Sequence, residues 1–209
     1  MIKAVLFDID GVLIDSFEAN LRFYQDLFIK TGYERITRER FFELRHMTMY
    51  DVITIVTKLE NKDEIDRIWK MGKGRAVPYR NSLLKSPEKY DEVIKILHDK
   101  YTLGLVTSRI YDGIFTVPQL AKYKSFFKVV VSYEDTKEHK PNPEPLLLAL
   151  RKLQLKAHEV VYVGDAQSDI DAAKSAHLKV IGYTRSVLTG AGAQTSDFAK
   201  IPELIESLP

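Results

Sequence analysis

The chain has 209 residues, of which 45% are hydrophobic and 29% charged, a composition typical of a folded globular protein. Its formal net charge of +2 favours neither nucleic acid nor an anionic membrane as a partner. The absence of cysteine excludes disulfides, thiolate metal sites and a cysteine nucleophile. The N-terminal apolar run is shorter than a membrane span and lacks a signal-peptide cleavage pattern, so we expect a cytoplasmic protein.

The first predicted element is a strand at residues 2–9, a continuous apolar run that ends in acid, as buried parallel strands do. A helix follows, because Asp15 and Glu18 have the spacing of a capping box and Gly32 can end the helix. From residue 15 to residue 84 the patterns are mostly helical, without the alternation of strands and helices seen elsewhere in the chain.

We interpret residues 15–84 as a helical cap domain, a lid, inserted into a catalytic core made of residues 1–14 and 85–209. Within the cap, the β-branched stretch 52–57 is ambiguous between strand and helix, and Pro78 is predicted to interrupt the last helix. Six aromatic residues are predicted to form the core of the cap: Phe17, Phe23, Tyr24, Phe28, Phe41 and Phe42.

After the cap, helices and strands alternate, which predicts a doubly wound α/β fold around a parallel sheet, similar to a Rossmann fold. The pair Ser86-Pro87 is expected to start the first helix of this part. The predicted strands are at residues 102–107, 128–132, 160–163 and 179–183, with helices at 89–98, 144–153 and 169–176.

Two acids follow the first strand, in the segment Phe7-Asp8-Ile9-Asp10-Gly11. Residues two apart in an extended segment point to one side, and the carboxyl ends of parallel strands are where such sheets bind ligands. Two neighbouring carboxylates repel each other, so we expect a cation beside them. The same pattern by itself also suits solvated acids before a glycine turn.

Phosphate-binding groups follow later strands. Thr107 and Ser108 can donate to phosphate oxygens, although a hydroxyl pair at that point also suits a helix cap. Lys140 lies in a loop stiffened by three prolines, which would hold its ammonium in place to neutralise phosphate or a carboxylate. Asp165 and Asp169 follow another strand and have the oxygen ligands that Mg²⁺ prefers.

The segments FDIDGVLIDS, LVTSR, KPNPEP and VGDAQSDIDAA resemble the four motifs of the haloacid dehalogenase superfamily. The subfamily is similar to phosphoglycolate phosphatases with a helical cap. The resemblance implies that Asp8 is the nucleophile and Asp10 the general acid and base, while Thr107 and the backbone of Ser108 hold the transferring phosphate and Lys140 steadies it.

The same resemblance implies a Mg²⁺ site formed by Asp8, Asp165 and the main-chain carbonyl of Asp10, supported by Asp169 directly or through water. Its substrate would be a small phosphorylated metabolite. One departure is His177, where relatives often carry glycine, so we expect a non-glycine residue in left-handed geometry there.

Three alternatives remain open at this point. A phosphosugar mutase of the same family would use the same residues and return the phosphoryl group to its substrate. A phospho-accepting receiver domain also uses Asp, Thr, Lys and Mg²⁺, but lacks a helical insertion and a late GDxxxD segment. A catalytically dead binding protein is disfavoured by the intact acids and lysine.

Substrate contacts in the cap are predicted at Arg45 and His46, which lie in an interhelical stretch where such caps often reach the core. The other basic residues of the cap are predicted to lie on solvated faces of its helices. Phosphoglycolate, pyrophosphate, a sugar phosphate and a nucleotide are all open as substrates, and the oligomeric state is open too.

Overall fold

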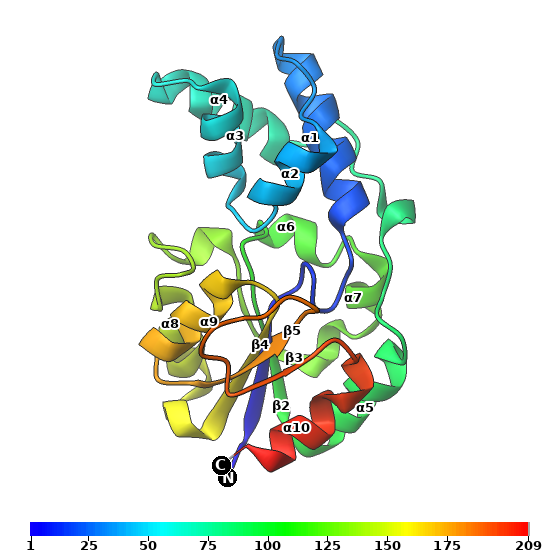
Figure 1. The fold of residues 1–209 in the computed structure, drawn as a ribbon, viewed down its shortest axis with the longest axis vertical. Coiled ribbons are helices and arrows are strands. Elements are labelled where there is room, and N and C mark those ends of the chain that lie inside the picture. Colours follow the sequence, from blue (N-terminus) through cyan, green and yellow to red (C-terminus); the bar gives the residue numbers. More distant parts are fainter. Residues whose placement is uncertain (209) are drawn as a thin grey trace. The chain divides into compact units, whose positions relative to one another are not determined.

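The computed structural model describes residues 1–208, which form two compact units (Figure 1). The first unit, here called the core, comprises Met1–Asp15 together with the chain from Lys85 onward. The second, here called the cap, comprises Ser16–Leu84. Within residues 1–208, no helix combines the length and the hydropathy that crossing a membrane requires.

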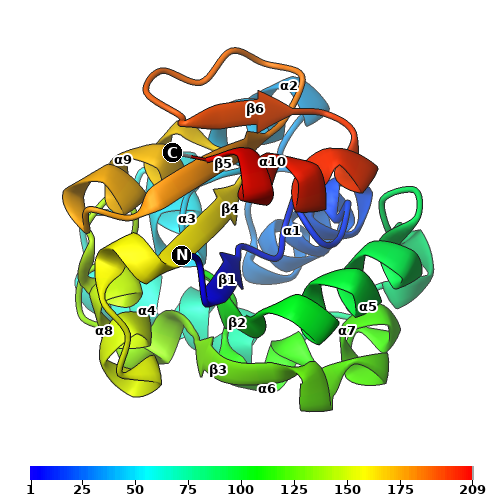
Figure 2. The same cartoon turned by 90° about the horizontal axis from the view of Figure 1, so that it is seen from below.

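The core is built on a six-stranded sheet in the order β3-β2-β1-β4-β5-β6, and all five pairings are parallel. Figure 2 shows α8 and α9 on one face of this sheet and α5 and α10 on the other. The predicted doubly wound α/β fold is therefore confirmed. The strands are β1 (Ala4–Phe7), β2 (Thr102–Val106), β3 (Phe127–Val131), β4 (Val160–Gly164), β5 (Lys179–Tyr183) and β6 (Ala193–Thr195).

Apolar side chains drive the packing of the helices onto the sheet. The strands β1, β2 and β4 are almost entirely buried, and the inner faces of α8 and α9 pack against them in one apolar cluster. The helices of the core are α5 (Tyr90–Lys100), α6 (Tyr111–Ile114), α7 (Pro118–Lys122), α8 (Glu144–Leu153), α9 (Gln167–Ser175) and α10 (Ile201–Ser207), with 3₁₀ turns η2 (Lys124–Phe126), η3 (Tyr133–Asp135), η4 (Ala157–Glu159) and η5 (Phe198–Lys200).

Several local predictions for the core are confirmed and two need correction. Helix α8 has the predicted bounds, and His177 has the left-handed geometry expected there, with φ of 58°. Helix α5 begins at Tyr90, three residues after Pro87, because Lys89 before it is itself left-handed. The strand β6 escaped prediction because it is short and half-exposed, so it shows no apolar run.

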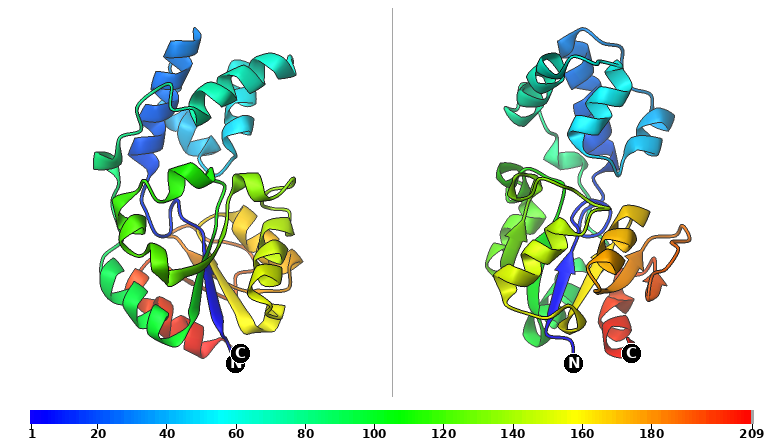
Figure 3. Two further views of the ribbon diagram at one scale, coloured as in Figure 1. Left: turned by 180° about the vertical axis from the view of Figure 1, so that it is seen from behind. Right: turned by 90° about the vertical axis from the view of Figure 1, so that its left-hand side faces the viewer.

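The cap consists of four helices and one 3₁₀ turn (Figure 3). Its interior is an apolar cluster that includes Tyr24, Phe28 and Phe41, with Phe17 and Phe23 partly buried against it. Phe42 was assigned to this cluster wrongly, because its position on α2 leaves it 55% exposed. The elements are α1 (Phe17–Thr31), α2 (Arg38–Leu44), α3 (Met49–Thr57), α4 (Lys62–Lys73) and η1 (Asn81–Leu83).

Two of the predicted helix boundaries in the cap are wrong for identifiable reasons. The N-cap of α1 is Ser16 rather than Asp15, and Glu18 pairs with Arg38 instead of completing a capping box. Pro78 does not interrupt a helix, because α4 already ends at Lys73. The predicted end of α1 is confirmed, since Gly32 has φ of 90° and its N–H caps the last turn.

Candidate active site

Predicted site residues gather at the carboxyl ends of neighbouring strands in the core. Asp8 follows β1, and its backbone N–H donates to Val163 O of β4 at 2.9 Å. Thr107 follows β2, and its N–H donates to Val131 O of β3 at 3.0 Å. Because parallel strands end at one edge of a sheet, these bonds hold both side chains at that edge.

The loop after β1 is shaped by Gly11, whose φ is 82° and whose N–H donates to Ile14 O at 2.8 Å. A Cβ at this position would lie 2.0 Å from Oδ2 of Asp165. Glycine is therefore required here both for its left-handed backbone and for the close approach of the Asp165 carboxylate. The turn brings that carboxylate against the loop that carries Asp8 and Asp10.

Lys140 reaches this acidic edge from the loop before α8, and its side chain is only 7% exposed. Its Nζ donates to Oδ1 of Asp169 at 2.6 Å and to the hydroxyl of Tyr162 at 2.9 Å. It also lies 3.1 Å from Oδ1 of Asp8. Two hydrogen bonds and one ion pair therefore surround the ammonium.

Asp169 is 1% exposed and serves as the hub of the site. Its Oδ1 accepts from Lys140 and from Tyr162, while its Oδ2 accepts from the backbone N–H groups of Asp165 and Ala166, both at 3.1 Å. This carboxylate caps the start of α9, which begins at Gln167. The four bonds make Asp169 a group that orients Lys140 and the backbone of Asp165.

The electrostatics of the site reflect the burial of several acids together. Burial raises the pKa of Asp8 to about 7; Lys140 opposes that shift, while Asp169 and Asp10 add to it. Burial likewise raises the pKa of Asp165 well above its usual range, with Asp169 and Asp8 adding to the effect. Burial works against the charge of Lys140, but Asp169 and Asp8 outweigh it and raise its pKa.

Three of these acids have the arrangement of a metal site. One carboxylate oxygen from each of Asp8, Asp165 and Asp169 lies within 4.8 Å of the others. All donors are hard oxygens, which suit Mg²⁺, and a divalent cation would offset the burial and the mutual repulsion that raise the pKa values of Asp8 and Asp165. The residues present therefore fit the expected ion, with Asp8 and Asp165 as the carboxylates best able to hold it.

Asp10 has a partner that the sequence patterns do not indicate. Nε and Nη2 of Arg109 donate to its two carboxylate oxygens at 2.6 and 2.7 Å, a bidentate pair between residues 99 positions apart. The Arg109 side chain is 13% exposed and that of Asp10 is 30% exposed. Such a fork fixes the orientation of a carboxylate more firmly than a single bond does.

The two hydroxyl residues that follow β2 differ in burial. Thr107 is buried, and its Oγ1 accepts from the N–H of Arg109 at 3.2 Å. Ser108 is half-buried. Because no helix begins within two residues of this pair, the helix-cap interpretation is wrong, and the bond to Thr107 instead shapes the loop that carries Arg109.

Within the cap, Arg45 and His46 lie between α2 and α3, and His46 is exposed. The Arg45 guanidinium lies 3.8 Å from the centre of the Phe42 ring and donates to the Phe42 carbonyl oxygen. The stacking and the bond hold the arginine along the outer side of α2.

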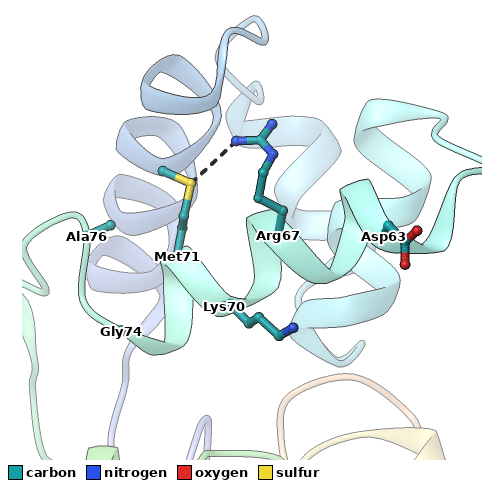
Figure 4. A pocket seen from close by; sticks show the side chains of 6 residues that line it. All are labelled: Asp63, Arg67, Lys70, Met71, Gly74 and Ala76. Carbon is teal, nitrogen blue, oxygen red and sulfur yellow. Dashed lines mark hydrogen bonds between the residues drawn. The ribbon is translucent and has the colours of Figure 1, made fainter.

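The cap also carries a hollow of about 520 Å³ beside α4 (Figure 4). Arg67 and Lys70 beside it are exposed, and Nη1 of Arg67 approaches the sulfur of Met71 at 3.6 Å. The lining contains no buried charge and none of the predicted site residues. It consists of Asp63, Arg67, Lys70, Met71, Gly74 and Ala76.

Comparison with known proteins agrees with this geometry. The family described as "Haloacid dehalogenase-like hydrolase" matches residues 5–183. The chain belongs to this family. The predicted resemblance and the prediction of a hydrolase are thus confirmed for this haloacid dehalogenase-like chain.

Individual relatives of this haloacid dehalogenase-like hydrolase cover most of its length. It is 30% identical over 187 residues to the pyrophosphatase PpaX of Bacillus pumilus, covering 89% of this chain and 85% of the relative. A HAD-superfamily hydrolase of subfamily IA from Geobacter sulfurreducens is 29% identical, with a TM-score of 0.73 and 98% and 96% coverage. The β-phosphoglucomutase of Clostridium difficile shares the fold, with a TM-score of 0.80 at 17% identity and 99% and 96% coverage.

Two residues of the site were missed by reasoning from sequence. Arg109 stands within the quoted LVTSR segment but received no role, because its partner is distant in the chain. Tyr162 was counted only as part of a strand. Its signal is a hydroxyl in an otherwise apolar buried run, since a buried hydroxyl needs a partner.

Proposed function

We propose that this chain is a Mg²⁺-dependent phosphatase that hydrolyses a small phosphorylated metabolite through an aspartyl phosphate on Asp8. The proposal rests mainly on the buried Asp8 carboxylate, which lies 3.1 Å from the Lys140 ammonium and within reach of Asp165. A cation and a metal site beside the carboxylate would offset the negative charge of a phosphoryl group that it attacks. A cytoplasmic location is part of the same proposal.

In the first step, an oxygen of Asp8 attacks phosphorus and the bond to the leaving oxygen breaks. Lys140, Thr107 and the backbone N–H of Ser108 are the groups proposed to offset charge on the transferring phosphoryl oxygens. Bound Mg²⁺, held by Asp8, Asp165 and the carbonyl of Asp10, would add charge neutralisation there. Asp169 contributes by orienting Lys140 and the Asp165 backbone.

Asp10 is proposed to donate a proton to the leaving oxygen and then to take one from the water that hydrolyses the intermediate. The bidentate pair with Arg109 occupies both oxygens and favours the charged carboxylate, so Asp10 has to turn from the fork to carry and donate a proton. A second acid beside the nucleophile favours phosphate esters and anhydrides, whose leaving groups gain from protonation.

The cap is proposed to act as a lid that excludes stray water during the reaction, with Arg45 and His46 as contacts for an anionic substrate. Support for the cap residues is limited to their charge and their position in the turn between α2 and α3. The PpaX relatives make inorganic pyrophosphate the first substrate to test, followed by phosphoglycolate, sugar phosphates and nucleotides.

A panel of these compounds with Mg²⁺ tests the proposal, with phosphate release and product identity followed by phosphorus NMR. We expect inorganic phosphate from at least one compound and none from Asp8→Asn. Absence of hydrolysis across the panel, or full activity of Asp8→Asn, would contradict it.

A phosphomutase is the second candidate, because a Thermotoga maritima protein assigned as a β-phosphoglucomutase is 25% identical over the full length of both chains. The same panel separates the two functions. A sugar phosphate that isomerises without releasing phosphate would favour the mutase.

A further inference from the structure

We propose that Tyr162 is a positioning residue whose hydroxyl sets the location of the Lys140 ammonium between Asp8 and Asp169. The inference rests on the proposed function of Lys140 and adds a residue to which the sequence motifs assign no role. It concerns a group that does not touch the substrate and acts through its neighbour.

Tyr162 stands on β4 with 0% of its surface exposed, in a strand otherwise made of valine and glycine. Its hydroxyl accepts from Nζ of Lys140 at 2.9 Å. It lies 3.0 Å from Oδ1 of Asp169 and 3.2 Å from the carbonyl oxygen of Val106, either of which can accept its single proton. The hydroxyl therefore accepts from the ammonium and donates to one of two neighbours, the Asp169 carboxylate or the backbone of β2.

The geometry of the ammonium explains why this third acceptor matters. Nζ of Lys140 is 2.6 Å from Asp169 and 3.1 Å from Asp8, so with the two acids alone it would be drawn toward Asp169. The tyrosine oxygen is a third group at hydrogen-bond distance from Nζ, and it is carried by a fully buried residue of β4. Three acceptors define the position of a three-proton donor, whereas two leave it free to swing.

The changing charge of Asp8 gives a second reason why the Tyr162 hydroxyl matters for the position of Lys140. In the proposed reaction Asp8 alternates between a free carboxylate and an acyl phosphate, so its attraction for Lys140 changes at each step. Tyr162 is neutral and its ring is packed in the core, with the Lys140 Nζ 5.6 Å from the ring centre. Its pull on the ammonium stays constant while that of Asp8 does not, which keeps Lys140 in place for both steps.

Tyr162→Phe removes the hydroxyl oxygen and leaves the ring, so it tests the inference with little disturbance. Tyr123→Phe is the matched control, because Tyr123 is also a buried core tyrosine and its hydroxyl donates to Asp91 at 2.8 Å. We expect Tyr162→Phe to lower kcat about tenfold and leave KM within about twofold, while Tyr123→Phe changes neither by more than about twofold. Melting temperatures of both variants report on the shared structural cost of a lost hydrogen bond.

The decisive comparison repeats Tyr162→Phe in a Lys140→Met background, using p-nitrophenyl phosphate at high enzyme concentration. If Tyr162 acts through Lys140, its loss changes the residual kcat by less than about twofold there. An equal tenfold loss in both backgrounds, or a kcat for Tyr162→Phe within twofold of wild type, overturns the inference. Should Lys140→Met not fold, the comparison of Tyr162→Phe with Tyr123→Phe decides alone.

The proposed function and the role of Tyr162 fail in different ways. If wild type releases no phosphate, or if Lys140→Met keeps full activity, the proposed function is wrong. If wild type is active and Lys140→Met is impaired while Tyr162→Phe is unaffected, only the role of Tyr162 is wrong.

Discussion

The core and the cap differ in whether their charged side chains are buried. Among residues 1–208, the carboxylates of the buried class, Asp8 and Asp169, both belong to the core, where Lys140 is 7% exposed beside them. The cap instead buries apolar side chains and carries its ion pairs on exposed faces, as in the pair of Arg40 with Glu43. Because burying a charge is costly, the contrast favours the core edge as the place of the proposed active site.

The same contrast separates two sources of stability. In the cap, the interior is apolar, and exposed pairs such as Arg40 with Glu43 contribute only about 0–1 kcal/mol. In the core, removing the last counter-charge of a buried ion costs about 3–5 kcal/mol, whereas neutralising Asp8 leaves Lys140 paired with Asp169. Changes in the core are thus expected to act on chemistry and charge, and changes in the cap on packing and substrate preference.

The largest expected effect comes from one substitution made in both regions. Asp8→Asn in the core should lower kcat by at least about a thousandfold, because an amide is a poor nucleophile. Asp26→Asn in the cap, which removes an ion pair with Arg80, should stay within about threefold of wild type. Steady-state kinetics on one substrate measure both, and loss of the contrast would remove the chemical distinction between core and cap.

Removal of the metal should have the next largest effect on activity. A chelator should abolish activity and Mg²⁺ should restore it, whereas Ca²⁺ should inhibit, because its longer bonds and higher coordination number let Asp8 bind through both oxygens. Mg²⁺ should also raise the melting temperature of wild type, and it should do so less for Asp165→Asn. Full activity in chelator would contradict a metal site at Asp8 and Asp165.

The acid and base function of Asp10 should depend on the leaving group. Asp10→Asn should lower the rate about a hundredfold for alkyl phosphates and much less for the first turnover of p-nitrophenyl phosphate, whose leaving group needs little protonation. Arg109→Gln is the control, since it removes the bidentate pair and keeps the carboxylate. An equal loss on both ester types would assign Asp10 a positioning role.

A smaller effect is expected from the turn between α2 and α3 in the cap. Arg45→Ala and His46→Ala should raise KM about three- to tenfold and leave kcat within about twofold, as residues that contribute only to substrate binding do. Arg40→Ala serves as a control, because Arg40 lies on an exposed face of α2. Unchanged KM for both variants would remove these two residues from the substrate site.

The smallest effect concerns stability against pH in the metal-free protein. The pKa of Asp8 is raised to about 7, against about 3.9 in unfolded chains. A carboxyl group with a raised pKa stabilises the fold fully below the unfolded pKa, and that contribution is lost as pH rises through the folded pKa. Asp8→Asn should therefore melt a few degrees above wild type at pH 8, with a smaller difference at pH 5.

Much of the core could be predicted from sequence because its signals are local. Apolar runs predicted β1 to β5, and the acids and hydroxyls that follow them were expected at one edge of the sheet. The strand β6 has no such run, and the Asp10–Arg109 pair joins residues 99 positions apart. Contacts of that kind depend on the order of the strands, which no local pattern reveals.

The cap was harder to predict because several capping patterns compete within a few residues. Asp15, Ser16 and Glu18 could each take part in starting α1, and the backbone of Asp15 instead exchanges hydrogen bonds with Lys85 of the core. Phe42 follows Phe41 in sequence but lies on the other side of α2, so only one of the two is buried. Its exposure is offset by the Arg45 guanidinium stacked on the ring.

The most direct test of the central proposal is to trap the covalent intermediate. Asp10→Asn with Mg²⁺ and p-nitrophenyl phosphate, quenched in acid within the first turnover, should carry one phosphoryl group on the peptide that contains Asp8. Mass spectrometry of the digested protein measures this, and Asp8→Asn/Asp10→Asn should carry none. Release of p-nitrophenol without any phosphorylated Asp8, or with the phosphoryl group on another residue, would contradict Asp8 as the nucleophile.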